Sequence, residues 1–123
     1  MSAMQTTQQE ALMNAVAGAA ITNLAPTTTG LSVAATGEHE AGIGRVDFVL
    51  IDLTSDPFSD DVDRKDVDYA RSPRHVTDAW ASSVALTPGV PYRVFFHVYD
   101  RSGVNLVAYD RRDFTYETEG VSR

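Results

Sequence analysis

The stretch Leu86-Thr87-Pro88-Gly89-Val90-Pro91-Tyr92 decides the fold of this chain. Pro88 and Gly89 form a turn, which delivers Tyr92 to the head of an alternating stretch that runs to Tyr99. In two-sheet sandwiches a Tyr at this place packs its ring in the core and bonds its hydroxyl to backbone a few residues upstream. The pattern Leu-x-Pro-Gly-x-x-Tyr therefore predicts a tyrosine corner at Tyr92, with an all-β sandwich around it.

Other short stretches with a period of two surround this corner, and each predicts a strand with one face inward. The expected strands are 20–24, 31–36, 45–52, 80–86, 92–99 and 106–116, the last with a bulge at 111–113. A polar, acidic segment at about 55–78 is either a long loop or hides an edge strand marked by Val67 and Tyr69. About seven short strands with turns between them predict two antiparallel sheets packed as a sandwich.

The length of 123 residues suits one domain with a packed core. We expect an N-terminal arm at 1–18, the sandwich at 19–118 and a C-terminal tail at 119–123. The arm is helical or extended; as a short helix it carries an apolar stripe of Leu12, Met13 and Val16. Such a short helix is marginal alone in water, so it must lie on its own sandwich or on a neighbour.

The composition excludes several classes of function. The formal net charge of −7 argues against nucleic acid as a partner, because binding phosphates needs a clustered basic surface. The chain has no Cys, hence no disulfide and no thiolate metal site. Its first residues show neither a basic signal-peptide start nor an apolar stretch long enough for a bilayer, so we expect no signal peptide and no membrane contact.

Two parts of the chain resemble known modules. Residues 36–52, with the core Gly-Ile-Gly-Arg-Val-Asp-Phe-Val-Leu, resemble the loop and third strand of bacterial and viral immunoglobulin-like modules. Residues 80–114 are similar to the last three strands of immunoglobulin-like and fibronectin type III modules. The resemblance covers about 19–118 and implies an immunoglobulin-like sandwich, of the kind that tailed viruses use for capsid decorations, fibres and tail proteins. The missing disulfide departs from antibody-type domains.

The residues that could do chemistry form no recognisable site. Asp61, Asp63 and Asp66 offer oxygen ligands of the kind that calcium takes, but the Gly and Glu positions of an EF-hand loop are absent. We interpret this cluster as a solvated acidic loop, with calcium as the alternative. The three His residues lack metal-site spacing, and no nucleophile elbow or phosphate loop is present. The sequence therefore predicts no catalytic residue, no cofactor and no enzymatic activity.

Strand parity predicts a patch on the outer face of one sheet. If Phe48 and Tyr92 point inward, their alternate neighbours on the two adjacent strands must point outward. These outward residues are Val49, Ile51, Phe95, His97 and Tyr99. A contiguous apolar patch usually marks a contact surface. We expect it to be covered either by another molecule or by the arm or acidic segment of the same chain.

The sequence thus predicts a non-enzymatic structural protein of a virion or similar assembly, made in the host cytoplasm. It would self-associate, dock on other virion proteins, or do both. The alternative is a recognition module that binds carbohydrate or another surface ligand through its loops. Trp80, Tyr69 and Tyr109 are then candidate aromatic platforms. We interpret Trp80 as a core residue instead, because it shares its parity with Val84 and Leu86.

Overall fold

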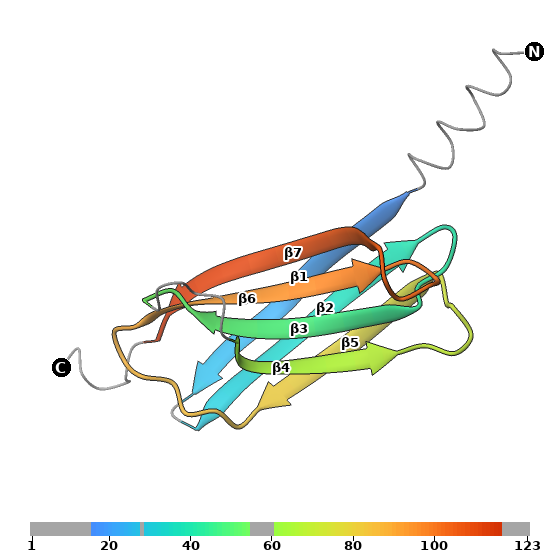
Figure 1. The fold of residues 1–123 in the computed structure, drawn as a ribbon. Helices are drawn as coiled ribbons and strands as arrows, with labels where there is room; N and C mark the ends of the chain where they lie inside the picture. Colours follow the sequence, from blue (N-terminus) through green and yellow to red (C-terminus); the bar gives the residue numbers. More distant parts are fainter. Residues whose placement is uncertain (1–15, 28, 55–60, 117–123) are drawn as a thin grey trace, which may run out of the picture.

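Seven antiparallel strands form two sheets packed face to face (Figure 1). The structure, a computed structural model, describes residues 16–27, 29–54 and 61–116. The first sheet has the order β1-β2-β5, with β1 at Ala17–Thr27, β2 at Gly30–His39 and β5 at His75–Ser82. The second has the order β4-β3-β6-β7, with β3 at Arg45–Asp52, β4 at Asp61–Asp68, β6 at Pro91–Tyr99 and β7 at Leu106–Thr115.

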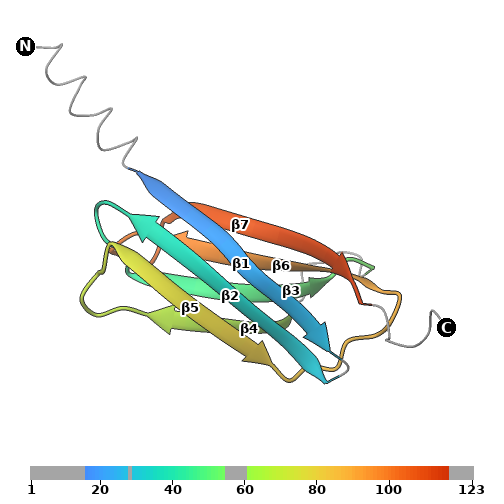
Figure 2. The ribbon, with the colours of Figure 1, turned by 180° about the vertical axis from the view of Figure 1, so that it is seen from behind.

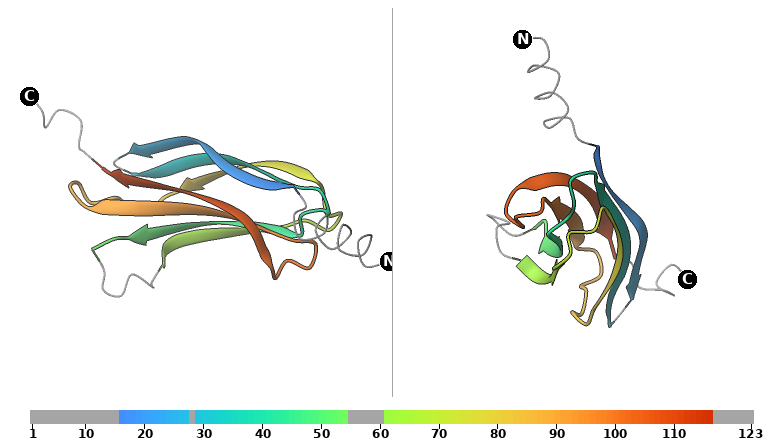
Figure 3. Two further views of the ribbon diagram at one scale, coloured as in Figure 1. Left: turned by 90° about the horizontal axis from the view of Figure 1, so that it is seen from above. Right: turned by 90° about the vertical axis from the view of Figure 1, so that its right-hand side faces the viewer.

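The two layers are plain in the other views. Figure 2 shows the three-stranded sheet from behind, and Figure 3 shows the layers from above and from one side. This confirms the predicted all-β sandwich of about seven strands. The described residues contain no helix, and so none with the length and apolar character to cross a membrane.

The core lies between the sheets; burial alternates along β2 and β6, whereas β3 is buried on both faces from Val46 to Ile51. On β6 every second residue is buried, and on β2 the residues at alternate positions from Leu31 onward are buried as well. Phe48 lies at the centre, with its ring centroid 5.0 Å from that of Phe96 and 5.8 Å from that of Trp80. The predicted inward residues of β2, β3 and β6 are all buried: Leu31, Val33, Ala35, Val46, Phe48, Leu50, Tyr92, Val94, Phe96 and Val98. Of the predicted inward residues in the 80–86 stretch, Trp80 and Leu86 are buried, whereas Val84 is only half-buried.

The tyrosine corner is confirmed. The Tyr92 ring is buried and stacks on Phe114, with centroids 5.6 Å apart. The Tyr92 hydroxyl oxygen accepts a hydrogen bond from the backbone N–H of Thr87 at 2.8 Å. Gly89 of the turn has a φ of 84°, in the region that favours glycine, which explains its place after Pro88.

Replacing Tyr92 by Phe removes this hydrogen bond and keeps the ring. We expect Tyr92→Phe to lower the free energy of unfolding by about 1 kcal/mol, the usual net value of one such bond. Urea denaturation of both chains measures the difference. An unchanged midpoint and slope would show that the corner hydroxyl contributes nothing.

Several strand limits differ from the prediction. β1 and β2 each extend beyond the expected 20–24 and 31–36, because Ala17 to Ala20 pair with residues up to His39. Because these small residues do not alternate between apolar and polar, the sequence did not predict that β1 and β2 extend this far. β5 begins at His75 and ends at Ser82, before the expected 80–86 stretch is complete. The acidic segment does hide an edge strand, β4, which contains Val67, whereas Tyr69 follows it.

The predicted bulge at 111–113 is wrong. These residues pair continuously with β6, and the irregularity lies nearer the start of β7, where Val107 is the extra residue between two paired positions. The charged run stays in the strand because its side chains find partners. Asp113 pairs with Arg93, and Arg112 donates to the backbone carbonyl of Ile21 at 2.7 Å.

Candidate functional site

The outer face of the four-stranded sheet gathers the residues that parity assigned to a contact surface. Val49 lies opposite Phe95 and Ile51 opposite Arg93, while Asp47 lies opposite His97. Residues opposite one another in antiparallel strands project to the same side. The predicted set of Val49, Ile51, Phe95, His97 and Tyr99 therefore shares this outer face, as expected, and together they line one hollow.

The aliphatic part of the predicted patch is already covered. Val49 is 7% exposed and Ile51 is 6% exposed. Val49 lies between Arg64 of β4 and Phe95 of β6, whose longer side chains flank it. This agrees in part with the expected covering by the acidic segment of the same chain, to which Arg64 belongs. What the outer face presents instead is aromatic and charged.

Three rings and two guanidinium groups form a ring column along β6. Phe95 and His97 stack with centroids 5.2 Å apart and an interplanar angle of 16°. Tyr99 continues the series, with its centroid 6.2 Å from that of His97. Arg93 lies over the Phe95 ring at 5.9 Å and Arg45 over the Tyr99 ring at 4.2 Å, so a cation closes each end.

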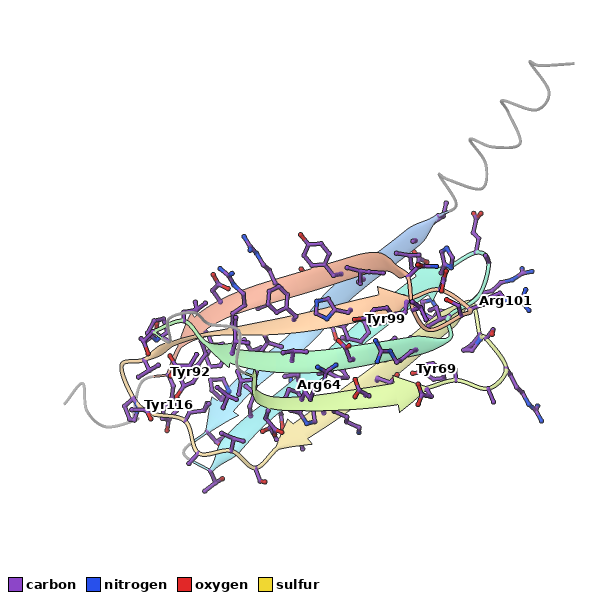
Figure 4. The ribbon with its side chains drawn as sticks, viewed as in Figure 1. Arg64, Tyr69, Tyr92, Tyr99, Arg101 and Tyr116 are labelled. Atoms are coloured by element: carbon purple, nitrogen blue, oxygen red, sulfur yellow. The ribbon has the colours of Figure 1, made fainter. Side chains whose placement is uncertain are left out.

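Asp47 anchors the column from β3. Its side chain is 1% exposed. Its carboxylate lies 2.6 Å from His97 Nδ1, and it accepts hydrogen bonds from the Tyr99 hydroxyl at 3.1 Å and the Arg64 guanidinium at 3.2 Å. Because an ionised carboxylate only accepts, Nδ1 of His97 carries the hydrogen that it donates. Figure 4 shows Arg64 and Tyr99 on this side of the sheet.

The charge state of Asp47 follows from these contacts. Burial alone would raise the pKa of its carboxyl, but the hydrogen bond and charge of His97, the Tyr99 hydroxyl and the Arg64 cation together hold it below the usual value. Tyr99 shows the complementary effect. Burial and the nearby Asp47 carboxylate raise the pKa of its phenol.

An open hollow of about 340 Å³ lies beside the column. Its lining comes from three strands: Arg64 of β4; Asp47, Val49 and Ile51 of β3; and Arg93, Phe95, His97 and Tyr99 of β6. Arg93 is held in place by Asp113, through contacts of 2.6 Å and 2.9 Å. The hollow thus has an apolar floor and charged walls whose charges are already paired.

Tyr109 stands at the β7 side of the same face. It is 56% exposed, while its ring packs at a tilt against Phe95 and His97, with centroids 6.5 Å and 6.3 Å away. The ring is therefore fixed at its base and free at its tip. Tyr109 lies within β7, as the predicted strand 106–116 placed it, and not on a loop.

The other candidate residues do not join this face. Leu12 and Met13 lie outside the described residues, and Val16 is 54% exposed just before β1. Pro88 and Gly89 form the corner turn. Trp80 is buried in the core, as interpreted, and Tyr69 packs partly against the core, so neither offers a free platform.

The acidic cluster is divided between two faces. Asp66 lies opposite Asp47 and pairs with Arg64 on the outer face. Asp63 lies opposite the inward Leu50 and accepts the Ser82 hydroxyl at 2.6 Å. The structure thus does not bring these two carboxylates together, and the side chain of Asp61 is outside its description. Among the described residues, no group of three His, Asp or Glu is placed to hold a metal ion.

Asp78 is a second unusual carboxyl, on the inner side of β5. Its Oδ2 is buried and lacks a hydrogen-bond partner in the described part of the chain. Burial raises its pKa, and the Lys65 cation offsets part of this rise. A carboxyl whose pKa is higher in the fold than in the unfolded chain costs stability as pH rises through the folded-state value.

We expect Asp78→Asn to stabilise the fold at neutral pH by up to about 1 kcal/mol, since water screens part of the penalty. The gain should vanish at acid pH, where the wild-type carboxyl is protonated. Asp100→Asn is the control of opposite sign, because hydrogen bonds from Ser102 and Asn105 lower the Asp100 pKa. Thermal unfolding from acid to neutral pH measures both. A gain for Asp78→Asn that does not depend on pH would contradict the argument.

Comparisons with known proteins support the fold alone. No protein-family model matches the sequence, and no curated protein matches it. Among solved structures, OgpA from Akkermansia muciniphila is similar with a TM-score of 0.50 and 8% identity, over 80% of this chain and 28% of that one. The Ruminococcus gnavus beta-glucuronidase gives a TM-score of 0.43 and 11% identity, over 82% of this chain and 16% of that one. The chain thus spans less than a third of these larger proteins.

Proposed function

We propose that this chain is a non-enzymatic protein-contact module that binds its partner through the outer face of the four-stranded sheet. The observation behind the proposal is the ring column, with Arg93 and Arg45 at its ends and Asp47 beneath it. Aromatic side chains and Arg are enriched at protein interfaces and supply most of the binding energy there.

The packing within the column supports a protein partner. Arg93 and His97 lie on either side of Phe95, and Arg45 covers Tyr99, so these rings have little open face left for a sugar to stack on. The column offers ring edges and guanidinium donors instead. Because its side chains already hold one another, little conformational entropy remains to be lost on binding.

The charges of the face support the same conclusion. Among the side chains that the structure describes, it carries four Arg and four Asp, which sum to zero in a chain of net charge −7. These residues are Arg45, Arg64, Arg93, Arg111, Asp47, Asp66, Asp68 and Asp113. A neutral face with paired charges loses less on desolvation than the acidic remainder of the surface would.

The wider role follows from the sequence resemblance. A small sandwich without a recognisable catalytic motif, with a neutral face and an N-terminal arm, suits a repeated component of a large assembly. We propose a virion as that assembly on the resemblance to viral immunoglobulin-like modules.

Carbohydrate binding is the second candidate, favoured by Tyr109. Its ring is more than half exposed and lies next to the hollow, where paired Asp and Arg groups could meet hydroxyls. A single open ring is a small platform compared with the closed column, which is why we place this function second.

Photo-cross-linking tests the proposal. A photo-reactive phenylalanine analogue replaces Arg111 on the outer face, and in a matched chain it replaces Ala79, which is exposed on β5 of the other sheet. We expect one protein adduct of defined mass from position 111 and none from 79, and excess unmodified chain should compete it away. Equal adducts from both positions, or none from 111, would contradict the proposal. A glycan array on which the chain binds while 111 gives no adduct would favour the carbohydrate function.

A further inference from the structure

We propose that the partner on the outer face is a second copy of this chain. The inference rests on the proposed function and specifies it. Two copies pack face to face about a two-fold axis parallel to the strands of the four-stranded sheets. Tyr109 of each copy then sits in the hollow of the other.

The outer face carries a projecting ring, Tyr109, near one edge and a hollow toward the other edge. The strand order β4-β3-β6-β7 places the hollow over β4, β3 and β6, whereas Tyr109 projects from β7. The base of the Tyr109 ring is fixed against Phe95 and His97, so its tip keeps one position relative to the sheet. The face therefore holds both halves of a contact that a single copy cannot make with itself.

A two-fold axis along the strands brings these halves together. It reverses the strand order, so that β7 of one copy faces β4 of the other, and β6 faces β3. In a two-fold interface each contact occurs twice, with the roles exchanged. Within one copy, Tyr109 of β7 lies opposite His97 of β6, and His97 lies level with Asp47 of β3 and Asp66 of β4. Tyr109 of the second copy therefore reaches this level of β4. Its hydroxyl thus meets the exposed carboxylate of Asp66, which can accept a hydrogen bond, whereas Asp47 is buried beneath the ring column.

The charge distribution fits a contact between copies. Each copy carries −7, so two copies carry −14 in total and repel at long range. The described side chains of the outer face sum to zero, and their ion pairs are already formed within each copy. Face-to-face packing of these side chains therefore buries no net charge. Added salt should strengthen the dimer, because it screens the repulsion between the acidic remainders.

The size of the face predicts a weak dimer. Four strands of about eight residues cover roughly 20 by 27 Å, or about 500 Å² of flat area, at the usual strand spacing and rise. Stable interfaces bury about 800 Å² of accessible surface per partner, so we expect dissociation in the micromolar range. Dilute samples will then be monomeric, and concentrated samples, or copies held in a larger assembly, will be paired.

Sedimentation equilibrium of the full chain tests this, from about 5 to about 500 µM and at about 0.05 and 0.5 M NaCl. We expect a monomer–dimer equilibrium that tightens with salt. Tyr109→Ala should raise the Kd at least about tenfold. Thr77→Ala, an exposed position of β5 on the other sheet, is the control and should leave the Kd unchanged. Thermal unfolding of both variants checks that neither change disturbs the fold.

The outcomes separate this inference from the proposed function. A chain that stays monomeric throughout, or a dimer that Tyr109→Ala leaves intact, overturns the inference. If the chain is monomeric while position 111 cross-links to a different protein, the contact module stands and the second copy is excluded. If position 111 gives no adduct either, both fall. A cross-linked dimer, mapped from position 111 to β4 of the partner copy, supports both.

Discussion

Asp47→Ala should lower the free energy of unfolding by about 3 kcal/mol at neutral pH, since it removes a buried carboxylate that accepts hydrogen bonds from three side chains. Asp47 accepts from His97, Tyr99 and Arg64 at once, and its own side chain is 1% exposed. Removing it takes the only shared acceptor from beneath the ring column. Chemical denaturation of the purified chain gives the difference directly.

The pH dependence of this loss has a definite sign. The pKa of Asp47 is held below its usual value in the fold, so its contribution is present above that usual value and disappears as pH falls through the folded-state pKa. The gap between wild type and Asp47→Ala should therefore narrow in acid. Asp113→Ala, which breaks the exposed pair with Arg93, is the control and should cost less than about 1 kcal/mol. Equal losses in the free energy of unfolding for the two variants would mean that Asp47 stabilises the fold no more than an exposed ion pair does.

Gly44→Ala should destabilise the fold by about 3 kcal/mol, at the upper end of the range for overpacking. A Cβ at Gly44 would lie 2.5 Å from the backbone oxygen of Arg101 and 2.6 Å from that of Asp100. The Gly44 N–H also donates to the Asp100 carbonyl at 2.8 Å, so the two loops cannot separate without losing that bond. Backbone on both sides must move to admit one methyl group.

Gly18→Ala provides the matched control for this variant. A Cβ at Gly18 meets only the side chain of Glu38, at 3.1 Å, and that side chain can turn away. We expect a change within about 0.5 kcal/mol. Thermal melts of the two variants beside wild type decide the matter. Similar melting temperatures for Gly44→Ala and Gly18→Ala would show that the close approach at Gly44 is not a constraint.

Local patterns were enough to predict most of the framework. The turn before Tyr92 showed which residues of β6 face the core. On β3, the prediction that every second residue from Val46 points inward placed Phe48 in the core. Once these two strands are neighbours, the outward position of Phe95, His97 and Tyr99 follows from geometry alone. The limits of β1 and β5 did not follow, because Ala, Gly and Thr residues there give no clear apolar period.

The interactions of the outer face could not be predicted in the same way. The sequence shows a lone Asp47 within the apolar stretch Val46-Asp47-Phe48-Val49, and this was the available sign of a buried polar contact. Which residue would meet it depends on the register of β3 against β6, which brings His97 to Asp47 across fifty positions. Loops far from both residues set that register, so no local pattern reveals it.

Covering of Val49 and Ile51 was expected, but the sequence left open whether it comes from the same chain or from another molecule. Their flanking side chains come from β4 and β6, and β4 lies in a segment that reads as a loop because of its charges. Long Arg side chains can lie over apolar neighbours while their charged ends stay in contact with water or a carboxylate. The charged character of β4 thus left its assignment open between a loop and an edge strand, and gave no sign of its place beside Val49.

Hydroxyl-radical footprinting tests most directly whether the outer face is the contact surface. The full chain is compared when dilute and when concentrated, or in the complex that cross-linking identifies. We predict that oxidation of Phe95, Tyr99 and Tyr109 falls several-fold on association, while that of Tyr69 is unchanged. Rings on the outer face that stay as reactive as in the free chain, with protection appearing on the β1-β2-β5 sheet instead, would contradict the account.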